Sequence, residues 1–136
     1  MIVTLPYLKR QFDEFNKLCF DEQLPMPRLR VGRAKTMLGC VRYKKEVGFL
    51  RKERYYDFSL IISSRYDMPE DMLEDTILHE MIHLYILTSH QKDDSAHGPL
   101  FRSIMKQLNS HYGRHITISV SKARAKELKM VETSPS

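Results

Sequence analysis

The residues best suited to chemistry lie in the segment TILHEMIHLY, where His79 and His83 are four positions apart and Glu80 follows the first of them. On a helix this spacing turns the two imidazoles by only about 40° around the axis and separates them by about 6 Å along it. Both rings can therefore reach one metal ion. Zinc prefers neutral imidazole nitrogens in a tetrahedral shell, and a catalytic zinc keeps one position open for water. The H-E-x-x-H pattern predicts such a site.

Glu80 is expected to supply the proton chemistry of this site. It lies about 100° around the helix from His79, where its carboxylate can accept a proton without occupying a coordination position. Zinc lowers the pKa of a bound water to about 7, so a carboxylate can act as the base at neutral pH. The metal-activated water attacks a peptide carbonyl, and Glu80 passes the proton to the leaving amine. The motif thus predicts a zinc metalloendopeptidase.

A third protein ligand is expected, and the sequence narrows the choice. The longer pattern H-E-x-x-H-x-x-G-x-x-H does not apply, because Ile86 and Ser89 occupy its glycine and last histidine positions. A glutamate ligand on a later helix would have to be Glu127 or Glu132, and both belong to the C-terminal tail. The remaining candidates are histidines.

Four histidines follow the motif. His90 shares the helix face but would lie about 10 Å beyond His83 if the helix continued. His97 follows a loop long enough to turn the chain, and Gly98 beside it permits close approach to the motif helix. His97 is therefore the favoured third ligand. His111 and His115 are weaker candidates for the third ligand. One of them, or Tyr112, could instead stabilise the oxyanion.

Two acids in the loop before His97, Asp93 and Asp94, admit two interpretations. Ligating imidazoles usually donate their other N–H to a carboxylate or a carbonyl, so either acid can orient a ligand from outside the metal shell. The simpler interpretation is that both are loop acids in water. The sequence favours the simpler one.

Helices must position the motif and the residues that follow it. A first helix is predicted after Thr4, which can cap it, with Pro6 in the first turn. A second helix, apolar on most sides and therefore buried, begins near Pro69 and carries the motif. A third helix follows the polar segment SHQKDDSAHGP and ends near Gly113.

Strands are predicted between the first two helices, at residues 29–32, 37–43 and 56–63, where apolar and polar residues alternate. Short connections favour an antiparallel sheet. A further short strand is predicted at residues 115–120, before a basic helical or frayed tail. The predicted fold class is α+β, with a small antiparallel sheet packed against the helix that bears the motif.

The chain has 136 residues, of which 42% are hydrophobic, and this length suits one domain with one core. No stretch approaches the roughly 18 apolar residues of a membrane span, and the first residues have no apolar signal core. We therefore expect no membrane partner and take the cytoplasm as the location. Cys19 and Cys40 form no closely spaced pair, so two buried thiols are expected rather than a disulfide.

The net charge of +5 hides a strong segregation of charge. Residues 28–54 hold ten lysines or arginines against two acids, whereas residues 66–100 hold eight acids against Lys92 alone. A basic patch of this density attracts nucleic acid or an acidic surface. The alternative is a solvated strand face.

Four segments together resemble the SprT-like metallopeptidase family: FNKLCFDEQLP near the start, LGCVRY, the HEMIH helix, and HGPLF at the opening of the next helix. The resemblance spans roughly residues 12–108. It implies a zincin-like α+β fold, zinc held by His79, His83 and His97, and Glu80 as the catalytic base.

The resemblance also implies a domain organisation and a substrate class. The SprT-like metallopeptidase domain would occupy residues 1–120, and residues 121–136 would form a basic tail. The substrates would be proteins bound or crosslinked to DNA, with DNA contacted through the basic segment 28–54. Many relatives carry a cysteine-rich zinc ribbon after the catalytic domain, and two cysteines cannot build one. Two alternatives stay open: a nucleic-acid-binding module with a structural zinc, and a general peptidase without DNA dependence.

Overall fold

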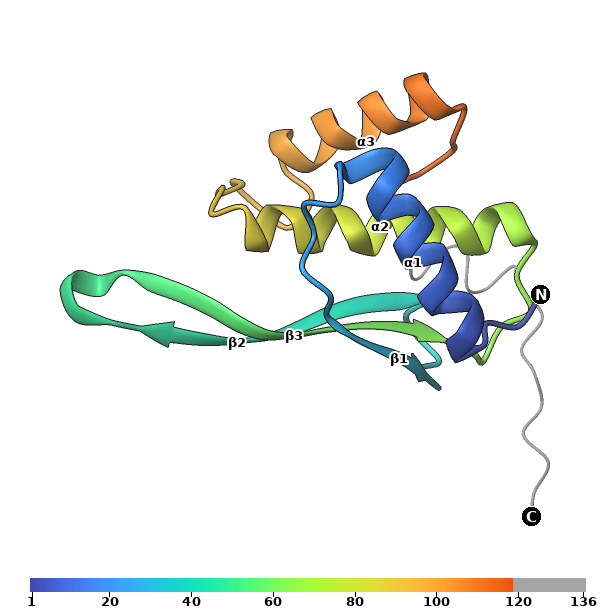
Figure 1. Ribbon diagram of the computed structural model, residues 1–136, viewed down its shortest axis with the longest axis horizontal. Coiled ribbons are helices and arrows are strands. Elements are labelled where there is room, and N and C mark those ends of the chain that lie inside the picture. Colours follow the sequence, from blue (N-terminus) through green and yellow to red (C-terminus); the bar gives the residue numbers. More distant parts are fainter. Residues whose placement is uncertain (119–136) are drawn as a thin grey trace, which may run out of the picture.

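Three helices and three strands make up residues 1–118, the part of the chain that the computed structural model describes. Figure 1 shows the helices gathered on one side of a small sheet, and a long hairpin that projects beyond them. The elements in chain order are α1 (Leu5–Phe20), β1 (Arg28–Gly32), β2 (Gly39–Val47), the 3-10 turn η1 (Phe49–Arg51), β3 (Glu53–Ser63), α2 (Glu70–Thr88) and α3 (Pro99–Tyr112).

Helix α1 begins as the sequence predicts. The Thr4 hydroxyl accepts a hydrogen bond from the Tyr7 backbone N–H at 3.3 Å, which satisfies one of the free N–H groups of the first turn. The helix ends where Asp21 adopts the left-handed conformation. Its apolar stripe, which includes Leu8 and Phe12, is fully buried against the rest of the core.

Helix α2 is the central element of the molecule. It contacts α1, α3 and the sheet, and in Figure 1 it lies between the sheet and α3. Leu73, Ile77, Leu78 and Met81 have no exposed surface, so burial on all sides, rather than an amphipathic stripe, fixes this helix. None of the helices within residues 1–118 is both long enough and apolar enough to span a membrane.

The sheet is mixed, which differs from the expected antiparallel arrangement. Its order is β1-β3-β2, with β2 and β3 antiparallel and β1 and β3 parallel. Successive strands do reverse direction, but β3 returns into the space between β1 and β2 and so runs alongside β1 in the same sense. The α+β class is confirmed, and the sheet packs against the motif helix as predicted.

Strands β2 and β3 are longer than predicted. Their outer halves form a two-stranded ribbon with most side chains exposed, so the alternation that marks a half-buried strand is missing there. Residues 115–118 of the strand predicted at 115–120 are not extended in a sheet. The rest of that strand and the basic tail lie outside the described residues.

The two cysteines are free thiols, as expected, but each is only half-buried. Burial raises the pKa of the Cys19 thiol to about 11 and also raises the pKa of Cys40. Both thiols are therefore protonated at neutral pH and poor nucleophiles.

Candidate metal centre

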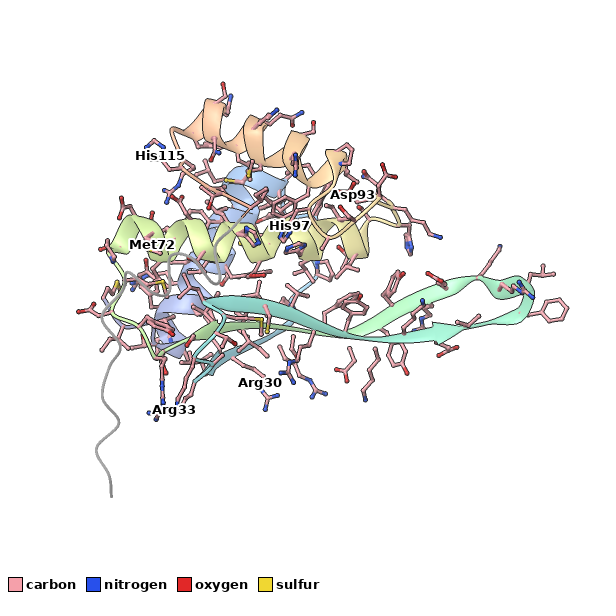
Figure 2. All side chains as sticks on the ribbon, turned by 180° about the vertical axis from the view of Figure 1, so that it is seen from behind. Arg30, Arg33, Met72, Asp93, His97 and His115 are labelled. Carbon is pink, nitrogen blue, oxygen red and sulfur yellow. The ribbon has the colours of Figure 1, made fainter. Side chains whose placement is uncertain are left out.

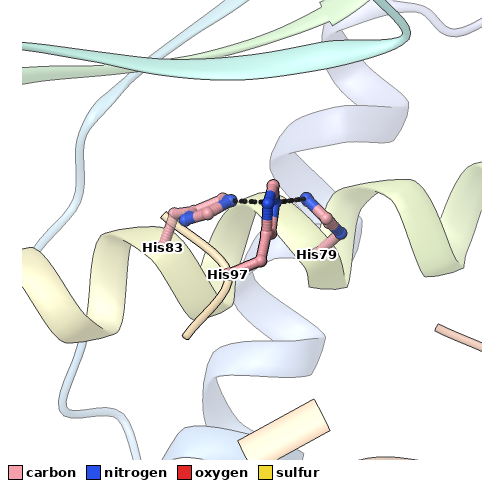
Figure 3. A group of neighbouring side chains, drawn as sticks. All are labelled: His79, His83 and His97. Carbon is pink, nitrogen blue, oxygen red and sulfur yellow. Dashed lines mark hydrogen bonds between the residues drawn. The ribbon is translucent and has the colours of Figure 1, made fainter. Parts of the chain in front are cut away.

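Three imidazoles converge on one point (Figure 3). His79 and His83 lie one turn apart on α2, and His97 precedes α3. The Nε2 atom of His97 lies 3.2 Å from the Nε2 of His79 and 3.2 Å from the Nε2 of His83. Each residue offers one nitrogen, and these nitrogens all lie within 4.8 Å of one another. The loop between α2 and α3 thus brings His97 to the two histidines of α2, although it lies 14 positions after His83 and 18 after His79.

A backbone carbonyl fixes the tautomer of His79. Its Nδ1 lies 2.8 Å from the carbonyl oxygen of Thr117. A carbonyl only accepts hydrogen bonds, so Nδ1 carries the proton and donates it. The Nε2 atom therefore has a free lone pair that points toward the other two histidines. This is the tautomer and the outer contact that metal-ligating histidines commonly show.

The spacing of the three nitrogens fits a shared cation. Two nitrogens bound to a tetrahedral zinc at about 2.0–2.1 Å are about 3.3–3.4 Å apart, close to the two distances of 3.2 Å found here. As a hydrogen-bonded group the cluster is poorly matched, because the Nε2 of His97 has at most one proton for two neighbours. A cation shared by all three nitrogens satisfies every lone pair.

The histidines are also in the protonation state that a metal requires. Burial lowers the pKa of His79 to about 4 and that of His83 to about 3, and neighbouring imidazoles add to the effect. Burial also lowers the pKa of His97. All three rings are therefore neutral at pH 7, the form in which imidazole binds zinc.

Phe101 forms an apolar floor beneath the three rings. Its ring centroid lies 4.9 Å from that of His79, 4.6 Å from that of His83 and 4.9 Å from that of His97. The side chain is fully buried. Because it contacts all three imidazoles, Phe101 restricts the rotation of each ring around its Cβ–Cγ bond.

Asp93 holds the end of the loop that carries His97. Its carboxylate accepts hydrogen bonds from the backbone N–H groups of Leu100 and Phe101, at 3.2 and 2.7 Å, and so caps α3. A Cβ atom at Gly98 would collide with this carboxylate. The glycine therefore permits the approach of Asp93, rather than the close approach to the motif helix that its position suggested. Asp93 supports His97 through the backbone, not as a hydrogen-bond partner of a ligand ring.

Glu80 lies in the same cleft as the histidines. The cleft has a volume of about 580 Å³, and its lining includes Glu80, the three histidines and residues of β2. The Glu80 side chain is only 4% exposed, and burial raises its pKa to about 8. It passes so close to β2 that a Cβ atom at Gly39 would lie 3.0 Å from its Cγ. Gly39 therefore leaves the space in which the carboxylate sits.

The other candidates from the sequence lie away from this cleft. His90 is exposed beyond the end of α2, in the left-handed conformation. His111 is exposed on α3, and His115 is exposed beyond that helix. The Tyr112 hydroxyl donates a hydrogen bond to the Leu18 carbonyl at 2.7 Å, which ties α3 to α1. None of these four residues is placed to stabilise an oxyanion at the histidine cluster.

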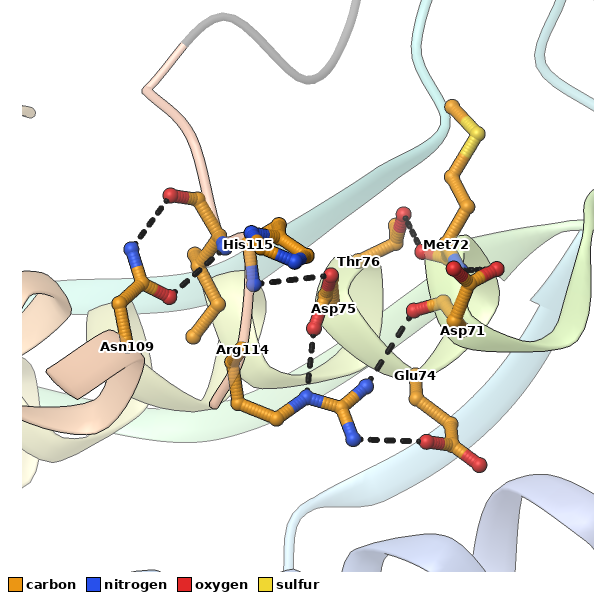
Figure 4. A network of polar contacts seen from close by, with 9 residues as sticks. Asp71, Met72, Glu74, Asp75, Thr76, Asn109, Arg114 and His115 are labelled. Carbon is orange, nitrogen blue, oxygen red and sulfur yellow. Dashed lines mark hydrogen bonds and ion pairs between the residues drawn. The ribbon is translucent and has the colours of Figure 1, made fainter. Parts of the chain in front are cut away.

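A polar network holds the segment that delivers the Thr117 carbonyl (Figure 4). Arg114 forms ion pairs with Glu74 at 2.9 Å and with Asp75 at 2.7 Å, both on α2. The Asn109 side chain bonds both the carbonyl and the N–H of Ile116. Sequence reasoning missed this support, because its contact with the site is a backbone carbonyl and a carbonyl leaves no signature in the residue types.

Comparison with known proteins agrees with the sequence resemblance. The model of the SprT-like family matches residues 8–122. The DNA-dependent metalloprotease SPRTN of Homo sapiens is 32% identical over 119 residues, which is 87% of this chain and 23% of that protein. The SPRTN of Xenopus tropicalis is 30% identical over 114 residues, or 83% of this chain and 25% of that protein.

A nematode relative matches a shorter stretch. The DNA-dependent metalloprotease dvc-1 of Caenorhabditis elegans is 41% identical over 51 residues, which is 37% of this chain and 14% of that protein. The chain thus spans about a quarter or less of the length of these relatives.

Proposed function

The chain belongs to the SprT-like family, and on that premise we propose that it is a zinc metalloendopeptidase that acts on DNA-associated or DNA-crosslinked proteins. The observation that carries the proposal is the convergence of three imidazole nitrogens in a cleft that also holds a buried carboxyl group. His79, His83 and His97 are the proposed ligands, and Glu80 is the proposed general base.

The residues of the cleft divide the chemistry between them. The three histidines bind the metal, and the Thr117 carbonyl keeps His79 in the ligating tautomer. Zinc held there would supply Lewis acidity, which would polarise a peptide carbonyl and acidify a water. Glu80 would accept a proton from the attacking water and return it to the leaving amine. A dication nearby favours the ionised carboxylate and so opposes the effect of burial on the pKa of Glu80.

Strand β2 supports an endopeptidase, because it forms one wall of the cleft and is an edge of the sheet. Its outer edge offers backbone N–H and C=O groups to an extended peptide, which can add as a further strand. Gly39 and Val41 line the cleft, so a peptide on this edge passes beside Glu80. Binding through the backbone suits a peptidase with loose sequence preference.

The DNA-related part of the proposal has two supports. The relatives are named DNA-dependent metalloproteases, and residues 28–54 carry a large excess of positive charge. DNA bound to that segment would raise the local concentration of DNA-bound proteins at the cleft.

The test uses the substitution Glu80→Gln, which removes the base and keeps the size of the side chain. We expect about one zinc per chain by metal analysis in both proteins, and cleavage of a basic DNA-binding protein slowed by about 10²- to 10⁴-fold in the variant. Cleavage is measured with and without single-stranded DNA. A zinc-loaded parent that never cleaves would instead indicate a binding module with a structural zinc, and cleavage indifferent to DNA would indicate a general peptidase.

A further inference from the structure

The tip of the β2–β3 hairpin exposes apolar side chains far from the core. Phe49 is 91% exposed and Leu50 is 77% exposed. Leu50 and Arg51 both adopt positive φ angles, of 66° and 59°, a conformation that disfavours residues other than glycine. An aromatic ring held in water on a strained turn contributes nothing to the core, so packing does not explain it.

Most cations next to this tip form no ion pair within the described residues, although Arg54 lies over the ring of Tyr56. Lys45 is paired with Glu53 at 3.1 Å, but within residues 1–118 no ion pair involves Arg51, Lys52 or Arg54. The one acid near them without an ion pair is Glu46, opposite Arg54 in the register. The tip therefore combines one exposed aromatic ring with a net positive charge.

The positive charge continues along the face of the sheet that points away from the helices. Leu60 and Ile62 of β3 face the helices and are fully buried, so by alternation Ser59 and Ile61 face outward. The register sets Arg28, Arg30 and Arg42 beside these outward residues. In Figure 2 the side chain of Arg30 points away from the helices, whereas His97 lies on the helix side.

The same outward face reaches the tip. The register shifts between Arg42 and Lys44, but Lys44 shares the face of Arg28 because both contact Asp57. Glu46 follows Lys44 by alternation, and Arg54 lies opposite Glu46. Asp57 partly neutralises the middle of the face, since it contacts Lys44 at 3.3 Å and Arg28 at 3.4 Å. Beyond it the face carries Arg54 opposite Glu46, and Arg51 and Lys52 follow at the tip beside the exposed ring.

A basic track that ends in an exposed aromatic ring matches the chemistry of single-stranded nucleic acid. Cations follow the phosphates, and the ring stacks on an unpaired base. An anionic membrane is a poorer match, because it requires a broad apolar face surrounded by cations, and here the cations are spread along a ribbon behind two apolar side chains. Base stacking also explains why the exposed apolar residue at the tip is aromatic.

We propose that the outward face of the β2–β3 hairpin binds single-stranded nucleic acid, with Phe49 stacked on an unpaired base and Arg51, Lys52 and Arg54 at the phosphates. The proposal rests on the DNA-related part of the proposed function and assigns the site. The eight residue steps of β2 from Gly39, beside Glu80, to Val47 span about 26 Å. A protein attached to the bound strand would therefore lie within reach of the cleft.

The test measures binding of the zinc-loaded 136-residue chain to a fluorescently labelled oligothymidylate by anisotropy. We expect Phe49→Ala to raise the dissociation constant about tenfold, as the loss of one stacked base does. Neutralising Arg51, Lys52 and Arg54 to glutamine should reduce the slope of log affinity against log salt by about 2. Neither result depends on hydrolysis, so failure of the peptidase chemistry and failure of this site are distinguishable.

Matched controls use residues on the helices. Leu18→Ala removes an apolar side chain that is 60% exposed on α1, and neutralising Lys9, Lys17 and Lys106 removes three exposed cations from α1 and α3. Both should bind the oligonucleotide as the parent does.

The proposal is overturned if the parent does not bind, if hairpin and control variants weaken binding equally, or if Phe49→Ala changes nothing. The hairpin variants are also tested on phosphatidylserine vesicles. If they lose vesicle binding while their oligonucleotide binding stays intact, the proposal is overturned in favour of a lipid surface.

Discussion

At the scale of single residues, the histidines and Glu80 make the stability of the folded state depend on pH in opposite directions. His79 and His83 are buried as neutral rings, with pKa values lowered from 6.5 to about 4 and about 3. Below pH 6.5 the unfolded chain therefore binds more protons at these positions, and the folded state loses stability as the pH falls. Burial raises the pKa of Glu80 from 4.5 to about 8, so the folded state loses stability there as the pH rises.

The balance predicts a stability maximum for the metal-free protein near pH 6.5. Between pH 4.5 and 6.5 two histidines outweigh one glutamate, and above pH 6.5 the histidine contribution fades and Glu80 outweighs it. In urea unfolding we expect the parent to lose about 1 kcal/mol between pH 6.5 and pH 8. Glu80→Gln should still lose unfolding free energy as the pH falls below 6.5, but it should lose none as the pH rises above 6.5. The same alkaline loss in both proteins would contradict the raised pKa of Glu80.

Spacing made part of the site predictable from the sequence. Positions i and i+4 of a helix share a face, so His79 and His83 had to be neighbours once the helix formed. His97 was reached only by elimination, because its approach depends on how the loop folds. The support from Thr117 was not predictable, since it comes from a backbone carbonyl 38 residues away from His79.

At the scale of elements, the segment after α3 is held to α2 by charge. Arg114 lies between Glu74 and Asp75, and its side chain is only 19% exposed. Removing it would leave two half-buried carboxylates without a partner and release the segment that carries Thr117. Arg114 is therefore a positioning residue for His79.

We expect Arg114→Leu to weaken zinc binding about tenfold, the lower end of the effect of outer contacts on metal ligands. Competition with a chelating dye measures this without any substrate, under conditions where circular dichroism shows a folded protein. Arg114→Lys, which keeps the charge, should recover part of the affinity. Arg114 also lies over the ring of Phe15. Arg10→Leu is the control, because Arg10 lies in the same way over the ring of Tyr7 on α1. Equal zinc affinity in the parent and Arg114→Leu would show that the ion pairs do not position the site.

The cap of α3 gives a second prediction at this scale. Asp93 accepts two backbone N–H groups at the helix start, and loss of such a cap costs about 1 kcal/mol. We expect Asp93→Ala to lower the unfolding free energy by about that amount and to weaken zinc binding, because His97 precedes the cap. Asp93→Asn keeps an acceptor oxygen and should cost less. Thermal unfolding with and without zinc measures both effects, and Asp93→Ala with unchanged stability would contradict the cap.

The elements themselves were predictable where one face is buried. The three helices follow from their apolar residues, with a cap at the start of α1, and the inner halves of the strands follow from alternation. The parallel pairing of β1 with β3 was not, because strand order depends on contacts distant in sequence. The outer hairpin was missed for a different reason, since Val47 and its neighbours face water on both sides.

At the scale of the whole molecule, the candidate metal centre joins α2 to the loop that precedes α3. His79 and His83 belong to α2, and His97 ends the exposed loop that leads to α3. A ligand that binds only the folded state stabilises it by about 4 kcal/mol when present at a thousand times its dissociation constant. Zinc should therefore raise the melting temperature by about 10 °C and restrict the loop.

Limited proteolysis separates the effect of zinc on the loop from its effect on the whole fold. It uses Glu80→Gln, which should not digest itself. Trypsin can cut after Lys92 in the exposed loop before His97 and after Arg51 or Lys52 at the hairpin tip. Chelation should accelerate the cut after Lys92 several-fold, because release of His97 lets the loop open. The cuts at the tip should not change, because about 26 Å of strand separates the tip from the metal centre. Equal acceleration at both sites would mean that metal removal unfolds the whole domain, and no acceleration at Lys92 would mean that His97 does not hold the loop through a metal.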